Sequence, residues 1–327
     1  MKILIFHAGG LGDLVNTAPA LRSLRARFAE AAITLAGPGS FIPLFSASGL
    51  AERTLSLESH GLHELWSEAP LSREVKGLVS SHDLAVSWVR SEQLLDRLRG
   101  LGLSVAAFSG PFPPPPGSGH VSEVLAGPLR ELGINESMPP PRLVLSPAAL
   151  AEGPRFSGVI LHPGSGSRHK NWPAENFVRV GEALHREAGL ELALLCGPAD
   201  EGPVKAVAAG LGPKVKALFS GLSIVSLASL LAGGRLFVGN DSGVSHLAGA
   251  VGAPVAAVYG PTDPSVWGVR QDRARNLSAG VDCSPCSREE MAGCGHKVCL
   301  DRLRPETVAE AALELLSRGG GPGSADL

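Results

Sequence analysis

Residues 237–264 read FVGNDSGVSHLAGAVGAPVAAVYGPTDP and predict a strand, a polar turn, a helix of small residues, a second strand and a Gly/Pro-rich turn. Asp241, Ser242 and Gly243 fall where the helix should begin, so its unpaired N–H groups and its positive end would face a ligand above the strand ends. His246 lies one helical turn further along on the same side. The stretch therefore predicts an anion site; the alternative is an ordinary capping turn.

Apolar segments of strand length alternate with helical segments along the whole chain. This alternation is typical of an α/β fold, in which helices cover both faces of a mostly parallel sheet. Pro19 belongs in the first turn of a helix, so we expect the first helix to begin near Asn16 or Thr17. The expected strands are KILIFH (2–7), AITLAG (32–37), DLAVSWV (83–89), SVAAFSG (104–110), GVILHPG (158–164), LELALLCG (190–197), VKALFSG (215–221) and RLFVGN (235–240).

A proline-rich segment at residues 138–156 interrupts this alternation, which restarts after it. We place a domain boundary there, giving two similar α/β domains, 1–150 and 151–327, each long enough for its own core. The last helix should run from Pro305 to about Arg318. The GGGPGSADL tail beyond it is expected to be disordered.

The composition excludes some classes of protein. The 327 residues carry a formal net charge of −2, so no basic excess attracts nucleic acid. No uninterrupted apolar stretch is long enough to span a membrane, and MKILIFH at the start predicts a buried strand rather than a signal peptide. We expect a cytoplasmic protein.

Four of the five cysteines fall in one short segment, at Cys283, Cys286, Cys294 and Cys299. A zinc site is one interpretation, but the loop between the second and third cysteine is shorter than in common zinc modules. Four reduced thiols or a labile disulfide are the alternatives.

Residues 7–13, HAGGLGD, follow the first expected strand and so lie at the carboxyl edge of a sheet, where open α/β proteins bind ligands. Gly10 and Gly12 supply a GxG, but Val15 stands where a dinucleotide fingerprint needs its third glycine. Such a turn lets the backbone approach a ligand and holds Asp13 at the rim. Asp13 is a candidate general base; the alternative is that it caps the first helix.

Residues 162–173, HPGSGSRHKNWP, take the equivalent place in the second half. Lys170 is the candidate cation for a diphosphate, helped by Gly164, Ser165 and backbone N–H groups; the alternative is a solvated loop. At the next strand end, Asp200 and Glu201 are candidate acceptors for ribose hydroxyls, unless they cap the following helix.

Taken together and in order, GLGD, PGSGSRHKNWP, GPADE, GNDSGVSHLAGAVGAP and YGPTDP resemble glycosyltransferase family nine, the heptosyltransferases that build the lipopolysaccharide inner core. The resemblance spans nearly the whole chain and is most specific in KNWP, DSGVSHL and YGPTDP. The segment CSPCSREEMAGCGHKVCLDRLRPE is similar to a Cys-bearing region of many members, so it supports membership more than metal binding. NTAPAL departs from the more usual HTLPAL and leaves the sugar and the acceptor open.

The resemblance implies a GT-B-type fold of two facing Rossmann-like, doubly wound domains with a cleft between them. It implies an ADP-heptose donor held mainly by the second domain, a lipid-linked core oligosaccharide approached from the first at the inner-membrane surface, and no metal or other cofactor. It assigns the base to Asp13, the donor-phosphate contact to Lys170, a ribose contact to Glu201, and the donor-binding turn to Asp241, Ser242, Gly243 and His246. A non-catalytic nucleotide-sugar-binding protein and a nucleotide-sugar epimerase of the same fold are the alternatives.

Overall fold

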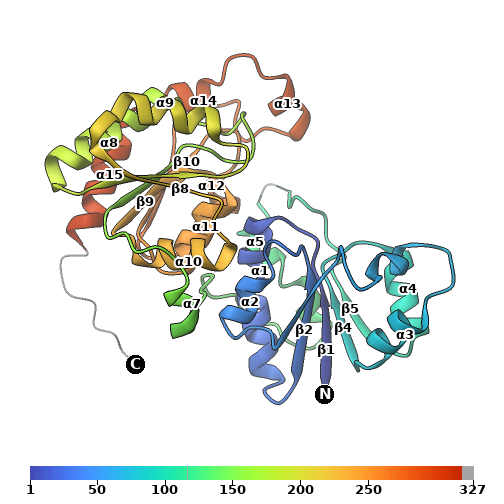
Figure 1. Ribbon diagram of the computed structural model, residues 1–327. Coiled ribbons are helices and arrows are strands. Elements are labelled where there is room, and N and C mark those ends of the chain that lie inside the picture. The colour runs from blue at the N-terminus through green and yellow to red at the C-terminus, as the bar shows by residue number, and fades with distance from the viewer. Residues whose placement is uncertain (116, 319–327) are drawn as a thin grey trace. The chain divides into compact units, whose positions relative to one another are not determined.

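The computed structural model describes residues 1–115 and 117–318 and divides the chain into two compact units (Figure 1). The first unit is Met1–Leu150 and the second begins at Ala151. The GGGPGSADL tail lies outside the described residues. Among the residues described, no helix has both the length and the apolar character needed to cross a membrane.

The first unit is built on a five-stranded parallel sheet in the order β3-β2-β1-β4-β5. Its strands are β1 (Lys2–Phe6), β2 (Ala32–Gly37), β3 (Arg53–Ser56), β4 (Leu84–Ser87) and β5 (Ser104–Ala107). Its helices are α1 (Leu11–Arg27), α2 (Pro43–Ala47), α3 (Arg73–Ser80), α4 (Glu92–Gly100), α5 (Val121–Val124) and α6 (Gly127–Arg130), with a short 3₁₀ turn at Leu62–Trp66. The short helix α7 (Pro147–Ala151) lies at the boundary between the two units. The central strands are apolar runs because both faces of a parallel sheet are covered, and residues 3–6 are fully buried.

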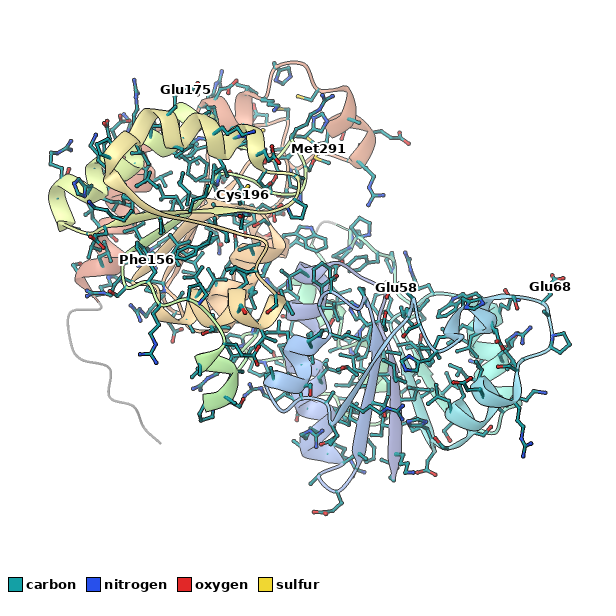
Figure 2. All side chains as sticks on the ribbon, in the orientation of Figure 1. Glu58, Glu68, Phe156, Glu175, Cys196 and Met291 are labelled. Atoms are coloured by element: carbon teal, nitrogen blue, oxygen red, sulfur yellow. The ribbon has the colours of Figure 1, made fainter. Side chains whose placement is uncertain are left out.

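The second unit carries a six-stranded parallel sheet in the order β11-β10-β9-β6-β7-β8. Its strands are β6 (Val159–His162), β7 (Leu192–Cys196), β8 (Val215–Ser220), β9 (Leu236–Asn240), β10 (Val255–Tyr259) and β11 (Ala274–Ser278). Its helices are α8 (Ala174–Ala188), α9 (Glu201–Leu211), α10 (Ile224–Gly233), α11 (Gly243–Ala250), α12 (Pro264–Trp267), α13 (Arg288–Gly293), α14 (Val298–Asp301) and α15 (Pro305–Ser317), with a 3₁₀ turn at Gly212–Lys214. Side chains fill the layers between sheet and helices; Cys196, at the end of β7, packs against this core (Figure 2).

Each sheet changes direction of winding at its first strand. β1 pairs with both β2 and β4, and β6 pairs with both β7 and β9. Open α/β sheets bind ligands in the crevice outside the carboxyl ends of the two strands at such a switch point. His7 directly follows β1, while His162 and Asn240 end β6 and β9. The topology therefore brings the loops after these strands to the ligand-binding edge of each sheet.

The start of α1 differs from the sequence-based prediction. The helix begins at Leu11, and Pro19 lies in its interior rather than in its first turn. Proline removes one backbone hydrogen bond there, but side chains tie the preceding turns together: Asn16 Nδ2 donates to the Gly12 carbonyl and Thr17 Oγ1 to that of Asp13, each over 2.8 Å. Because α1 begins at Leu11, Gly12 lies inside the helix. The extended part of the glycine turn ends at Gly10.

Candidate active site

The candidate site is built around the N-terminus of α11. β9 ends at Asn240, and Ser242 caps the helix by accepting the N–H of Ser245 at 3.3 Å. Asp241 and Ser242 are buried, as is His246 on the next turn, whose N–H reaches the Ser242 carbonyl over 3.3 Å. The predicted DSG turn therefore does begin a helix, and its positive end favours a negatively charged ligand.

Three segments meet at the carboxylate of Asp241. Lys170 Nζ lies 2.7 Å from Asp241 Oδ2, and Thr262 Oγ1 donates to the same oxygen over 2.6 Å. Lys170 comes from the loop after β6, and Thr262 from the YGPTDP turn after β10. The Lys170 side chain is a quarter exposed, whereas that of Asp241 is 7% exposed. Asp241 thus holds a solvent-accessible ammonium group beside the start of α11.

Asn240 fixes the loop that carries Lys170, a role that the sequence reasoning missed. Its side chain is fully buried; Oδ1 accepts the Trp172 N–H at 3.1 Å, and Nδ2 donates to the carbonyls of Pro163 and Gly164 at 2.9 and 3.2 Å. The Asn240 amide thus connects both ends of the loop between β6 and α8 to the end of β9. A buried asparagine at the end of an apolar strand was the available signal, because such a group needs hydrogen-bond partners.

Ser165 shapes this loop from within. Its Oγ lies 2.5 Å from Asn171 Oδ1 and 2.7 Å from the Ser167 carbonyl, and it accepts the Ser167 N–H at 3.3 Å. Gly166 has a φ of +71°, a left-handed conformation that suits glycine. The loop is therefore a folded turn rather than a loose solvated segment.

Asp200 corrects one expectation, because it is buried beneath the loop rather than presented to a ribose. Its Oδ2 accepts from His162 Nε2 and from the Gly197 N–H, both at 3.0 Å. The pKa of Asp200 lies below its ordinary value. Burial alone would raise it, but the hydrogen bonds from His162 and from the N–H groups of Gly197 and Gly166 stabilise the charged form and outweigh burial. A Cβ on Gly164 would lie 1.9 Å from the Asp200 carboxyl, so Gly164 is required for this close approach.

Glu201 lies on the surface at the first turn of α9. It pairs with Lys205 one turn later at 3.0 Å, and both side chains are about three-quarters exposed. The position leaves its carboxylate accessible to a ligand.

The glycine turn of the first unit presents Asp13 on the first turn of α1. Asp13 is partly exposed, and its Oδ2 accepts the Gly10 N–H at 3.1 Å. This contact is the helix-capping geometry considered from the sequence. A carboxylate has several acceptor positions, so capping and proton transfer are compatible roles.

The four clustered cysteines are free thiols that line one cavity of about 20 Å³ together with His169. Burial raises the pKa of Cys286 and Cys299, whereas N–H donors from His296 and Lys297 lower that of Cys294. Across residues 1–115 and 117–318, no group of three or more His, Cys, Asp or Glu side chains is arranged to hold a metal ion. In the described residues the four thiols thus surround one cavity without forming such a group, and the zinc interpretation stays a prediction.

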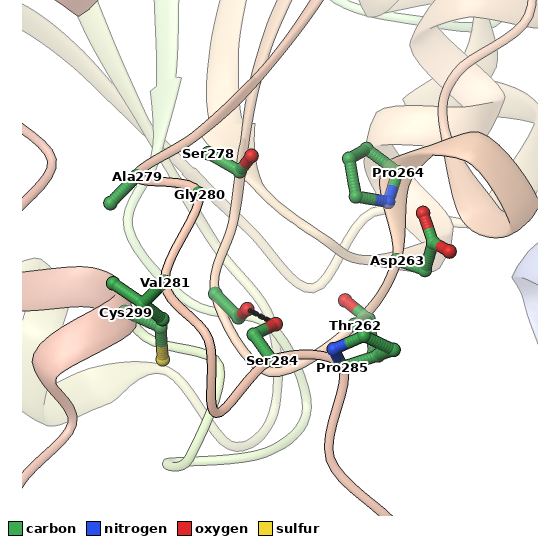
Figure 3. A pocket seen from close by; sticks show the side chains of 11 residues that line it. Thr262, Asp263, Pro264, Ser278, Ala279, Gly280, Val281, Ser284, Pro285 and Cys299 are labelled. Carbon is green, nitrogen blue, oxygen red and sulfur yellow. Dashed lines mark hydrogen bonds between the residues drawn. The ribbon is translucent and has the colours of Figure 1, made fainter.

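The cysteine-bearing segment instead braces the loops of the site. Lys297 Nζ donates to the Arg168 carbonyl over 2.7 Å, and Cys286 N–H donates to the Pro261 carbonyl over 2.8 Å. Ser284 Oγ donates to the Gly260 carbonyl over 2.6 Å, the dashed contact of Figure 3. Beside it lies a cavity of about 230 Å³ whose wall includes Thr262 (Figure 3). The segment thus supports both the Lys170 loop and the Thr262 turn.

The two units are Rossmann-like, as in glycosyltransferases of the GT-B class. The chain superposes on a family 9 glycosyltransferase of Veillonella parvula with a TM-score of 0.78 at 20% identity, covering 97% of each chain. It superposes on ADP-heptose lps heptosyltransferase II of E. coli with a TM-score of 0.73 at 19% identity, covering 98% of this chain and all of that one. These similarities confirm the expected fold class.

The chain belongs to glycosyltransferase family 9 (heptosyltransferase), whose sequence profile matches residues 124–294. That range contains Lys170 and Asp241 but not Asp13. Lipopolysaccharide heptosyltransferase 1 of Pseudomonas aeruginosa is 30% identical over 168 residues, 46% of this chain and 45% of that protein. Lipopolysaccharide heptosyltransferase 1 of Escherichia coli K12 is 24% identical over 295 residues, 82% of this chain and 90% of that protein.

Proposed function

We propose that the protein transfers a heptose from ADP-heptose to a hydroxyl of a lipopolysaccharide core acceptor, with inversion at the anomeric carbon and without a metal ion. The observation that carries the proposal is the contact of Lys170 and Thr262 with Asp241 at the N-terminus of α11. Membership of glycosyltransferase family 9 supports sugar transfer, and the similarity to lipopolysaccharide heptosyltransferases supports heptose as the sugar.

Breaking the bond between sugar and diphosphate leaves negative charge on the phosphate. Lys170 has three N–H donors, so one contact to Asp241 leaves others for phosphate oxygens. The N–H groups of α11 add positive potential at the same place. These groups supply the charge stabilisation that other enzymes obtain from a divalent cation.

The opposite end of the reaction needs a base for the proton of the acceptor hydroxyl. We assign this role to Asp13, because a carboxylate can accept the proton as the new bond to the sugar forms. Attack from the face opposite the leaving phosphate inverts the anomeric centre. Asp13 and Lys170 belong to different units, so the proposal requires the units to close around both substrates.

The acceptor is lipid-linked, so we place the protein in the cytoplasm, at the surface of the inner membrane. Surface arginines of the first unit are candidate contacts for acceptor phosphates, although several already serve the fold. Arg22 donates to the Arg142 carbonyl over 2.6 Å, and Arg25 lies 2.6 Å from a carboxylate oxygen of Glu52.

The test is turnover of ADP-heptose with a heptose-deficient core glycolipid, in buffer with and without EDTA. We expect a product heavier by one heptose, an anomeric configuration opposite to that of the donor by NMR, and equal rates in both buffers. A product of retained configuration would refute inversion, and loss of activity in EDTA would refute metal independence. Donor binding without transfer would favour a non-catalytic protein, and a chemically altered donor without acceptor would favour an epimerase.

A further inference from the structure

The glycine turn that precedes Asp13 packs against a buried histidine. His7 directly follows β1 and is 3% exposed. Its Nδ1 lies 3.1 Å from the Gly9 backbone nitrogen, and its Nε2 lies 3.1 Å from Thr17 Oγ1. Thr17, which is 1% exposed, lies 2.8 Å from the Asp13 carbonyl oxygen through the same hydroxyl.

The donor and the acceptor of each hydrogen bond in this series, from Gly9 through His7 and Thr17 to Asp13, can be assigned without ambiguity. The Gly9 N–H can only donate, so His7 Nδ1 accepts and carries no proton. The Asp13 carbonyl can only accept, so the Thr17 hydroxyl donates to it and must accept from His7 Nε2–H. His7 is therefore neutral and protonated on Nε2. Burial, which lowers the pKa of His7 to about 4, is consistent with this state.

Steric contact adds to the hydrogen bonds. A Cβ placed on Gly9 would lie 2.7 Å from His7 Cε1 and 2.8 Å from Asp13 Cβ. Gly9 is thus closely packed between the His7 imidazole and the first turn of α1. In addition, the Gly10 N–H donates to the Asp13 carboxylate at 3.1 Å. The backbone and the side chain of Asp13 are each fixed by a separate contact.

We propose that His7 and Thr17 are positioning residues, which hold the backbone of Asp13 so that its carboxylate meets the acceptor hydroxyl. The inference rests on the proposed role of Asp13 as the base. Neither residue needs to touch substrate: Thr17 anchors the Asp13 carbonyl, and His7 orients Thr17 while holding the turn at Gly9. A displacement of about 1 Å at a reacting group can lower a rate by about a hundredfold.

The decisive variant is Thr17→Val, which removes the hydroxyl at nearly constant volume. We expect kcat to fall by about tenfold to a hundredfold, while the dissociation constant for ADP stays within about twofold, because the donor groups belong to the second unit. Thr17→Ser keeps the hydroxyl and should recover most of the rate. Thr54→Val, on the edge strand β3, is the matched control and should have the kcat of the parent protein.

Three results separate the inference from the proposed function. Normal kcat in Thr17→Val, with Asp13→Asn inactive, would overturn the positioning role and leave Asp13 as the base. Full activity of Asp13→Asn would overturn the proposed base itself. Parallel loss of kcat and ADP affinity in Thr17→Val would mean general destabilisation and would also overturn the positioning role.

A measurement on the unaltered protein keeps the inference testable if Thr17→Val does not fold. The ¹⁵N shifts of the His7 imidazole should report a neutral ring protonated on Nε2 throughout pH 5.5 to 8. A ring protonated on Nδ1, or a charged ring in that interval, would break the chain of donors and overturn the proposal.

Discussion

Lys170 Nζ lies 2.7 Å from Asp241 Oδ2, although the two residues are 71 positions apart in the sequence. A lysine side chain is long and flexible, and the ion pair fixes its charge at one point. Asp241 belongs to the turn that starts α11. The ammonium group and the positive end of the helix therefore lie close together and attract the same anion. The contact therefore joins the two features that the sequence could indicate only separately.

Replacing Lys170 with Met should weaken ADP binding. Hydrogen bonds that involve a charged group contribute about 1.5 to 3 kcal/mol, which corresponds to a loss of about tenfold to 150-fold in affinity. Calorimetric titration with ADP measures this loss. Lys214→Met is the control, since Lys214 pairs with Glu182 over 2.9 Å on the surface of the same unit. Equal affinities in the two variants would place the diphosphate elsewhere.

Replacing Asp13 with Asn should lower kcat by about a hundredfold to ten-thousandfold, the usual contribution of a general base. The amide keeps the volume and can still accept the Gly10 N–H, so the helix cap should survive. Affinity for ADP and the melting temperature should therefore change little. A drop in melting temperature with nearly normal kcat would show that Asp13 is a cap and not a base.

Introducing a Cβ at Gly164 should displace the loop that carries Lys170. The new atom would lie 1.9 Å from the buried Asp200 carboxyl, so either the loop or the carboxylate must move. We expect Gly164→Ala to lower both the melting temperature and the affinity for ADP. Gly202→Ala is the control, because its Cβ would meet nothing within 4 Å in α9. It should leave affinity unchanged and stabilise the helix by up to about 1 kcal/mol. Unaltered ADP affinity in Gly164→Ala would show that the loop does not need this contact.

The neutral state of His7 should make stability depend on pH. Burial lowers its pKa from 6.5 to about 4, so between these values the unfolded chain binds a proton that the folded protein does not. The free energy of unfolding should therefore fall as the pH drops from about 6.5 to 4, by on the order of 3 kcal/mol from this group. The slope should be smaller in His7→Gln. Comparing slopes removes the contribution of His82, whose pKa burial also lowers. Identical slopes would contradict the assignment.

Prediction from the sequence was most successful where one segment contains its own signal. The helix at 174–188 and the apolar central strands were predicted because their periodicity is local. The edge strands β3 and β11 were missed, since an edge strand needs no continuous apolar run; their sequences RTLS and ARNLS are partly polar and partly exposed. α1 begins earlier than Pro19 alone predicts, because the side chains of Asn16 and Thr17 form hydrogen bonds with the preceding helical turn.

The sequence by itself determined the α/β class, the glycine turns, the DSG helix start and the family, because each depends on residue types at fixed short spacings. The tertiary structure decided which buried side chains form hydrogen bonds or close contacts with those turns. Asp200 is buried and accepts hydrogen bonds from His162 and Gly197. Asn240 holds the loop that carries Lys170. His7 is hydrogen-bonded to Gly9 and Thr17 on either side of Asp13. These roles depend on burial and on contacts between distant segments. Such contacts exist only after the strands pair and bring their carboxyl ends to one edge of the sheet.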